Sequence, residues 1–173
     1  YLTCEENFNG YFKGPPAPSA DQKRYGLTEN GFGFRWHEHD ERFDATRHPN
    51  ELNRFGWGVE IVPWHPEQAP VKRTALGRFK HEGATVTLAR DGRAVVYMGD
   101  DERFEYVYKF VSRDRYRAGD PGNASLLDEG VNYLAGRYLR GRGALRLQED
   151  GADIALSVAL PARRFLNLQA VVA

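Results

Sequence analysis

The chain has 173 residues, of which 41% are hydrophobic and 13% aromatic, a composition that argues against intrinsic disorder. Its 24 basic and 24 acidic residues give a net charge of zero, so no overall field would attract nucleic acid or an acidic membrane surface. No run approaches the roughly 18 to 20 apolar residues of a membrane-spanning helix, and the single cysteine excludes an internal disulfide.

Short runs rich in β-branched and aromatic residues predict an all-β fold, since helical periodicity is scarce. The predicted strands are residues 31–36, 57–62, 71–79, 84–90, 93–98, 104–111 and 153–160. Residues 12–28 contain several prolines and residues 37–54 are highly charged, so both segments are expected to be surface loops.

The first candidate site is the segment Thr3–Asn7, which carries a thiol, two carboxylates and an amide. In a strand, Cys4 and Glu6 would share one face while Glu5 faces the other; in a turn all three can converge. A thiolate favours softer transition metals and carboxylates favour iron, manganese or calcium, so this mixture suits a site that holds more than one kind of ion. The alternative is a solvated acidic turn beside a buried thiol.

Two histidines, His37 and His39, would share one face of a strand, but no third ligand follows with a known zinc spacing. The charges around them indicate a loop, so we do not expect a metal site there. Arg35 and Arg54 are candidates for binding a phosphate through their planar guanidinium groups, although nothing in the sequence singles them out among nineteen arginines.

The clearest local unit is a β-hairpin over residues 84–98, in which Asp91-Gly92 predicts a type I′ turn with positive φ at both residues. Together with a third strand, it forms a meander typical of a β-propeller blade or of a β-sandwich sheet. His81 and Glu82 precede the hairpin, as site residues or as an exposed polar corner. The acidic residues 100–102 follow it, and such a triplet either binds calcium or forms a hydrated turn.

Four ordered segments resemble the PhoX-type alkaline phosphatases. They are TCEENFNGYF at 3–12, GWGVEI at 56–61, VKRTALGRFKHEGA at 71–84 and VYMGDDERFEYVYKF at 96–110, and the likeness covers residues 1 to about 130. The resemblance implies a six-bladed β-propeller, exported to the periplasm or beyond, that hydrolyses small phosphate monoesters with a cluster of iron and calcium. It implies that Cys4 is an iron ligand and Glu82 a ligand of the cluster, with Glu5 and Glu6 as further ligands.

Residues 1–130 are therefore expected to form a partial propeller of two to three blades, and residues 131–173 a divergent tail rich in Arg, Gly, Ala and Leu, from a shifted reading frame or a fragment. A propeller needs all its blades to cover its strand edges, so we expect this chain alone to be inactive or poorly folded. The full-length family is expected to be monomeric.

Two alternatives remain open at this point. The chain can be a non-catalytic propeller segment that serves as a binding or structural module. It can also be a calcium-dependent lactonase or esterase on a similar propeller, an enzyme that would have no use for Cys4.

Overall fold

The computed structural model describes residues 1–137, 144–149 and 152–157 and divides into two compact units. Unit 1 comprises Tyr1–Lys72 and Arg78–His81, and unit 2 comprises Arg73–Gly77 and the chain from Glu82 onward. Within the described ranges, no helix has the length and apolar character needed to cross a membrane.

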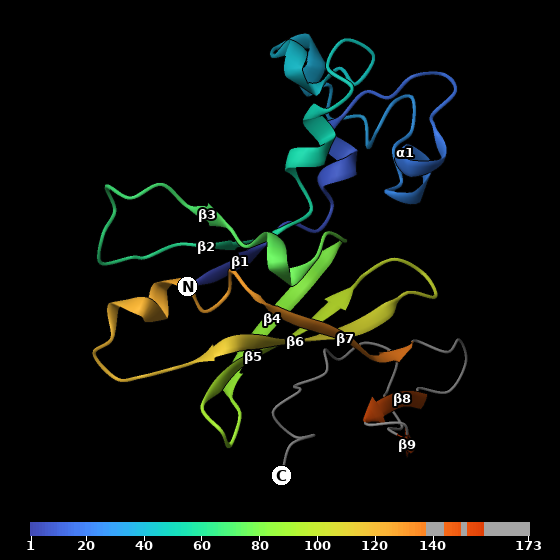
Figure 1. Ribbon diagram of the computed structural model, residues 1–173. Coiled ribbons are helices and arrows are strands. Elements are labelled where there is room, and N and C mark those ends of the chain that lie inside the picture. The colour runs from blue at the N-terminus through green and yellow to red at the C-terminus, as the bar shows by residue number, and fades with distance from the viewer. Residues whose placement is uncertain (138–143, 150–151, 158–173) are drawn as a thin grey trace. The chain divides into compact units, whose positions relative to one another are not determined.

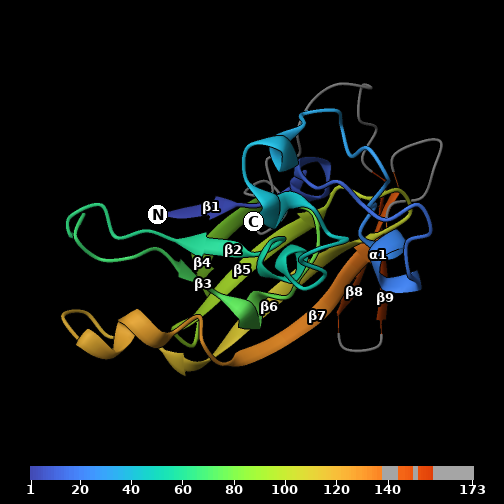
Figure 2. The ribbon, with the colours of Figure 1, turned by 90° about the horizontal axis from the view of Figure 1, so that it is seen from above.

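Unit 1 contains a small antiparallel sheet of three short strands, β1 (Leu2–Cys4), β2 (Gly58–Glu60) and β3 (Val71–Lys72), in that order (Figure 2). Its helices are η1 (Phe8–Tyr11), α1 (Ala20–Arg24), η2 (Trp36–Glu38), η3 (Glu41–Phe43) and η4 (Glu51–Arg54). Only α1 is α-helical. It begins after Ser19, whose hydroxyl accepts the Gln22 backbone N–H while the Gln22 side chain accepts the Ser19 N–H.

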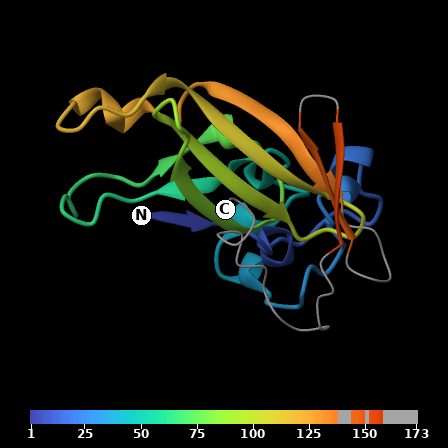
Figure 3. The same ribbon diagram turned by 90° about the horizontal axis from the view of Figure 1, so that it is seen from below.

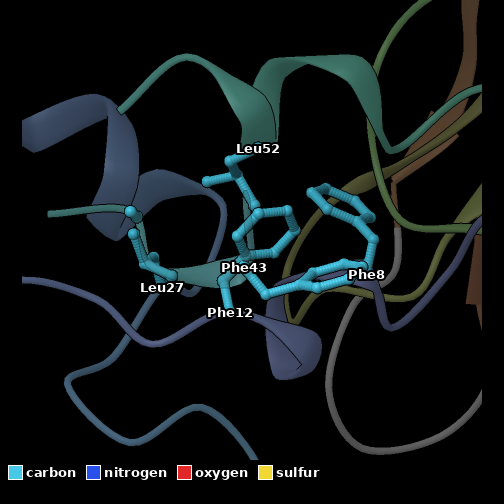
Figure 4. Close-up of a cluster of buried hydrophobic side chains, with 6 residues drawn as sticks. Phe8, Phe12, Leu27, Phe43 and Leu52 are labelled. Carbon is cyan, nitrogen blue, oxygen red and sulfur yellow. The ribbon is translucent and has the colours of Figure 1, made fainter. Parts of the chain in front are cut away.

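Aromatic side chains from loops and 3₁₀ helices form the core of unit 1 (Figure 4). The buried members are Phe8, Phe12, Leu27, Phe43, Ala45 and Leu52. The Phe12 ring is central, with ring centroids of Phe43 and Phe55 at 5.3 and 5.5 Å. Since regular hydrogen-bonded elements are few and short here, burial of these rings is the main interaction that holds the loops of unit 1 together.

Two of the predicted strands are wrong, one entirely and one in part. Residues 31–36 form turns because Gly31, Gly33 and Arg35 have φ of 53°, 77° and 60°, values that no β-strand contains. Of residues 71–79, only β3 is a strand, and a 3₁₀ helix, η5 (Thr74–Leu76), follows it. The strand predicted at 57–62 is confirmed in shorter form as β2.

Unit 2 is built on a four-stranded meander, β4 (His81–Leu88), β5 (Arg93–Asp100), β6 (Tyr106–Arg115) and β7 (Gly130–Arg137), in sequence order (Figure 1). A 3₁₀ helix, η6 (Pro121–Ser125), lies between β6 and β7 in the chain, and β8 (Ala144–Glu149) and β9 (Ala152–Ser157) form an antiparallel pair. The meander confirms the three strands predicted over residues 84–111. In β5, the consecutive residues Ala94, Val95 and Val96 are all buried, so this strand is covered on both faces.

The turn between β4 and β5 differs from the predicted type I′ turn. The Gly92 N–H donates to the Ala89 carbonyl and the Ala89 N–H to the Arg93 carbonyl, both at 2.9 Å, which encloses a three-residue loop. Gly92 takes a φ of 85°, but Asp91 does not have a positive φ. A three-residue hairpin loop needs a left-handed residue only at its last position, which explains why glycine stands there.

Strand β7 begins at the boundary predicted after residue 130 and pairs with β6, with Tyr133 opposite Lys109. Residues 131–137 thus share a sheet with residues 106–115. The two-domain division stays a prediction, and what was predicted for residues 138–143, 150–151 and 158–173 lies outside the described residues. The strand predicted at 153–160 is confirmed where it is described, as β9.

Candidate functional site

Cys4 is the last residue of β1, where it lies opposite Gly58 of β2, and the chain then turns through Glu5 and Glu6 toward η1. Its thiol is half-buried. Burial raises the pKa of the Cys4 thiol, and the negative charge of Glu6 raises it further. Cys4 and Glu6 are therefore close enough to interact, although Glu6 lies beyond the end of β1. Without a nearby cation the thiol keeps its proton at neutral pH.

Glu5 faces a different set of partners. Its Oε2 accepts the backbone N–H groups of Gly56 and Trp57 at 3.0 and 3.1 Å, and its Oε1 accepts the Lys72 ammonium at 2.8 Å. Lys72 also donates to the Arg54 carbonyl. The carboxylate thus joins the end of β1 to the turn before β2 and to β3. This network gives Glu5 a structural role, and its role as a metal ligand stays a prediction.

The Glu5 network leads to a stability prediction. Replacing Glu5 with glutamine removes the charge from three hydrogen bonds, and we expect it to lower the free energy of unfolding by about 1–3 kcal/mol. Urea unfolding followed by circular dichroism measures the loss. Glu67→Gln is the matched control, because Glu67 is exposed and, among the described residues, its carboxylate pairs with the nearby His65. Equal stabilities of the two variants would contradict a structural role for Glu5.

In unit 2, Glu82 is the second residue of β4, and Asp101 directly follows β5. Partial burial of the Glu82 carboxyl raises its pKa, and the charge of Asp101 raises it further. Asp100 is 2% exposed, and its Oδ1 accepts the Glu102 N–H at 3.1 Å in a tight turn. The structure therefore brings Glu82 together with one member of the acidic triplet 100–102, although the two lie far apart in the sequence.

His81 is fully buried, so the prediction of an exposed polar corner is wrong for this residue. Its ring stacks on Phe79 at a centroid distance of 3.7 Å. Its backbone N–H lies 3.3 Å from the Glu5 carbonyl, so it helps to fix the chain beside Glu5. His37 and His39 lie at η2 and its end rather than on a strand.

The arginines considered as phosphate clamps are already engaged. Arg35 forms a bidentate pair with Glu38 at 2.7 Å for both bonds, and Arg54 pairs with Glu51 at 3.3 Å. Unit 2 also has a groove of about 610 Å³ near β6 and β7, with Arg93 and Arg113 among its lining residues. Both of these guanidinium groups are paired as well. Arg93 binds Asp91, and Arg113 binds Asp114 and Glu129.

Asn9 is a buried polar residue that the sequence did not single out. It is 3% exposed, and its Nδ2 donates to the Gly26 carbonyl at 2.9 Å. Its Oδ1 is buried and has no hydrogen-bond partner among the described residues. An unsatisfied buried amide oxygen is costly, and it is also a donor of the kind that calcium takes. The position of Asn9 inside the TCEENFNGYF segment was the only signal available in the sequence.

The described residues therefore do not form a complete metal site. In the described ranges up to residue 157, no group of three or more His, Cys, Asp and Glu side chains is arranged to hold an ion. Within unit 1, Glu6 lies near enough to Cys4 to raise the pKa of its thiol, and within unit 2, Asp101 does the same for the Glu82 carboxyl. The donor atoms still fit the expected metals. A thiol beside a carboxylate suits iron, whereas carboxylate oxygens and an amide oxygen suit calcium.

Comparisons with known proteins give a family match and a match to a solved structure. A family model described as alkaline phosphatase PhoX matches residues 1–151, past the predicted end of the likeness near residue 130. A solved structure of Pseudomonas fluorescens PhoX in complex with vanadate, a transition state analogue, is 53% identical, with a TM-score of 0.73. The match covers 79% of this chain and 25% of that chain. A comparison with curated proteins finds no match.

The all-β meander and these matches define part of a β-propeller of the phosphatase class. The chain belongs to the alkaline phosphatase PhoX family. It spans about a quarter of the length of the solved relative.

Proposed function

We propose that this chain is part of a phosphatase that hydrolyses phosphate monoesters with bound iron and calcium. The family match over residues 1–151 carries the proposal. Bound metals of this kind neutralise the phosphate oxygens, orient the ester for in-line attack and lower the pKa of a bound water. With that charge stabilisation supplied, little acid or base chemistry is left for side chains.

Cys4 would contribute a thiolate to iron. Because burial and Glu6 raise the pKa of the Cys4 thiol, the proton leaves only when a cation replaces it, and metal binding should release that proton. Glu6, beside the sulfur, would supply a harder donor to the same ion or to its neighbour. Glu5 would act as a positioning residue, since its bonds to Gly56, Trp57 and Lys72 fix the chain directly after Cys4.

Glu82 would supply a carboxylate to the metals from unit 2. The charge of Asp101 raises the pKa of the Glu82 carboxyl, and a divalent cation bound near these two carboxylates would offset that repulsion. The buried Oδ1 of Asn9 is a further oxygen donor in unit 1.

The protein is also proposed to act outside the cytoplasm. Calcium is abundant outside the cytoplasm, which supports export of the protein. We also propose that the 173 residues alone are inactive, because the chain spans a quarter of its solved relative. The remaining ligands would come from other parts of a longer protein.

Hydrolysis of an aromatic phosphate ester by the full-length gene product tests the function. We expect turnover that a chelator abolishes and that added iron and calcium restore. A full-length product without activity and without bound metal would contradict the phosphatase proposal and favour a binding or structural module. The 173-residue chain, assayed with both metals added, should show no turnover, and robust turnover would overturn the proposed inactivity of this part.

A further inference from the structure

The Arg78 side chain is fixed in place by other residues of unit 1. Its Nε donates to the Phe55 carbonyl at 2.8 Å, and its Nη2 donates to the Leu52 carbonyl at 2.9 Å. The guanidinium carbon lies 3.8 Å from the centroid of the Tyr25 ring and 5.5 Å from that of the Phe8 ring. These hydrogen bonds and aromatic rings hold the planar group in one orientation.

The positive charge of Arg78 has no carboxylate to neutralise it in the part of the chain that the structure describes. Arg35 and Arg47 of the same unit differ in this respect, since Arg35 pairs with Glu38. Arg47 likewise pairs with Glu41. Arg78 is half-buried, and its acceptors are carbonyl oxygens, which carry no full negative charge. A partly desolvated charge of this kind is stabilised when an anion binds to it.

Arg78 also keeps donors for a ligand. A guanidinium group has more N–H groups than the bonds to Phe55 and Leu52 use. Both of these bonds lie on the Nε–Nη2 edge, so the Nη1–Nη2 edge is the one that a ligand can approach. Two parallel N–H groups on this edge match two oxygens of a phosphate.

Other cations surround the ring that supports Arg78. Tyr25 directly follows α1, the blue helix at the right of Figure 3. The guanidinium carbon of Arg24 lies 5.9 Å from the centroid of the Tyr25 ring. A β-carbon on the next residue, Gly26, would lie 3.2 Å from the Lys80 Nζ. The charges of Arg24 and Lys80 add to the positive potential around Tyr25, which favours an anion there.

We propose that Arg78 binds a phosphate group in unit 1, through the Nη1–Nη2 edge of its guanidinium. A phosphate monoester carries a charge of about −1.5 to −2 at neutral pH, which complements the cations around Tyr25. The inference goes beyond the proposed function and does not rest on it, because this site uses no metal. The residues that hold Arg78 all belong to unit 1, so its position does not depend on other parts of a longer protein.

Titration calorimetry of the full-length gene product with inorganic phosphate tests the site. We expect the unsubstituted protein to bind one phosphate more than Arg78→Gln, whether or not metals bind another. Arg47→Gln is the matched control, because it removes the same charge from an arginine that pairs with Glu41. The same number of bound phosphates in Arg78→Gln and the unsubstituted protein, or an equal loss in both variants, would overturn the proposal.

A second variant leaves the bonds of Arg78 to the carbonyls intact. Arg24→Gln removes only a neighbouring charge, and we expect it to weaken binding of the additional phosphate by about two- to threefold. The loss should shrink at high salt, which screens charges that do not touch the ligand. An affinity that is unchanged in Arg24→Gln at low salt would contradict a cationic site around Tyr25.

Phenylphosphonate, an analogue of a phosphate monoester that water does not cleave, distinguishes the source of the phosphate group. If the site receives the ester, phenylphosphonate should displace inorganic phosphate from it, and Arg78→Gln should remove this competition. If the site receives the released product, inorganic phosphate alone should bind. Binding of neither ligand in a manner that depends on Arg78 would overturn the proposal.

Discussion

Replacing Phe12 with alanine is expected to lower the free energy of unfolding by about 3–5 kcal/mol, the cost of removing a buried phenyl ring and leaving a cavity. Phe12 is 1% exposed and packs against Phe43 (Figure 4). Its ring also contacts the Phe55 ring. The surrounding segments are loops and 3₁₀ helices, so no long hydrogen-bonded element compensates for the lost contacts. We therefore expect Phe12→Ala to loosen unit 1 as a whole.

Tryptophan fluorescence during urea unfolding reports this loss selectively. The three tryptophans of the chain, Trp36, Trp57 and Trp64, all lie in unit 1. The matched control is Phe34→Ala, because Phe34 is 51% exposed and its removal should cost about 1 kcal/mol or less. Unfolding midpoints that fall equally for the two variants would contradict a core centred on Phe12.

Replacing Gly130 with alanine is the second large effect that we expect. Gly130 begins β7, and a β-carbon at this position would overlap both the Val111 carbonyl oxygen and the Phe110 ring. Phe110 is fully buried, so its ring cannot move aside without disturbing the core of unit 2. Overpacking of this kind costs about 1–3 kcal/mol.

Two other strand glycines provide the controls. Gly83 in β4 and Gly99 in β5 have open space where a β-carbon would lie. Alanine at either position should be neutral or slightly stabilising, because the unfolded chain loses conformational freedom. Hydrogen exchange of the β6 amides measures the effect locally, and it should accelerate only in Gly130→Ala. Protection as high as in the unsubstituted chain would show that β7 can shift away from β6.

The meander of unit 2 was predictable because its signals are local. Val95, Val96 and Met98 stand in a run of high β-propensity, and the Asp-Gly pair marks the turn that precedes it. The exact turn was not predictable from the dipeptide, since Gly92 satisfies either a two-residue or a three-residue loop, and the backbone pairing of Ala89 with Arg93 decides between them.

Unit 1 was harder to predict because its structure depends on contacts that are distant in sequence. The aromatic run 31–36 looks like a strand, but the left-handed backbone at Gly31, Gly33 and Arg35 cannot belong to one. The partner of Glu5 is Lys72, 67 residues away, and no pattern links the two. The sequence thus located Glu5 in a candidate site without revealing that its carboxylate joins three segments.

The candidate site was predictable only in its residue types. The TCEEN motif left a strand and a turn open for Cys4, Glu5 and Glu6; β1 ends at Cys4, and the charge of Glu6 raises the pKa of the Cys4 thiol. Burial reverses the expectation for His81, because a polar residue at a strand end gives no sign that a phenylalanine ring will stack on it. The ligation of metal by Cys4, Glu5, Glu6 and Glu82 stays a prediction.

Iron content of the full-length gene product tests the central claim most directly. We expect iron and calcium in the purified protein, and loss of most of the iron in Cys4→Ala, together with loss of the visible absorption that a ferric thiolate gives. Glu67→Gln, an exposed acid of unit 1, should retain both metals. Iron that is unchanged in Cys4→Ala would remove Cys4 from the site and contradict the proposed metal centre.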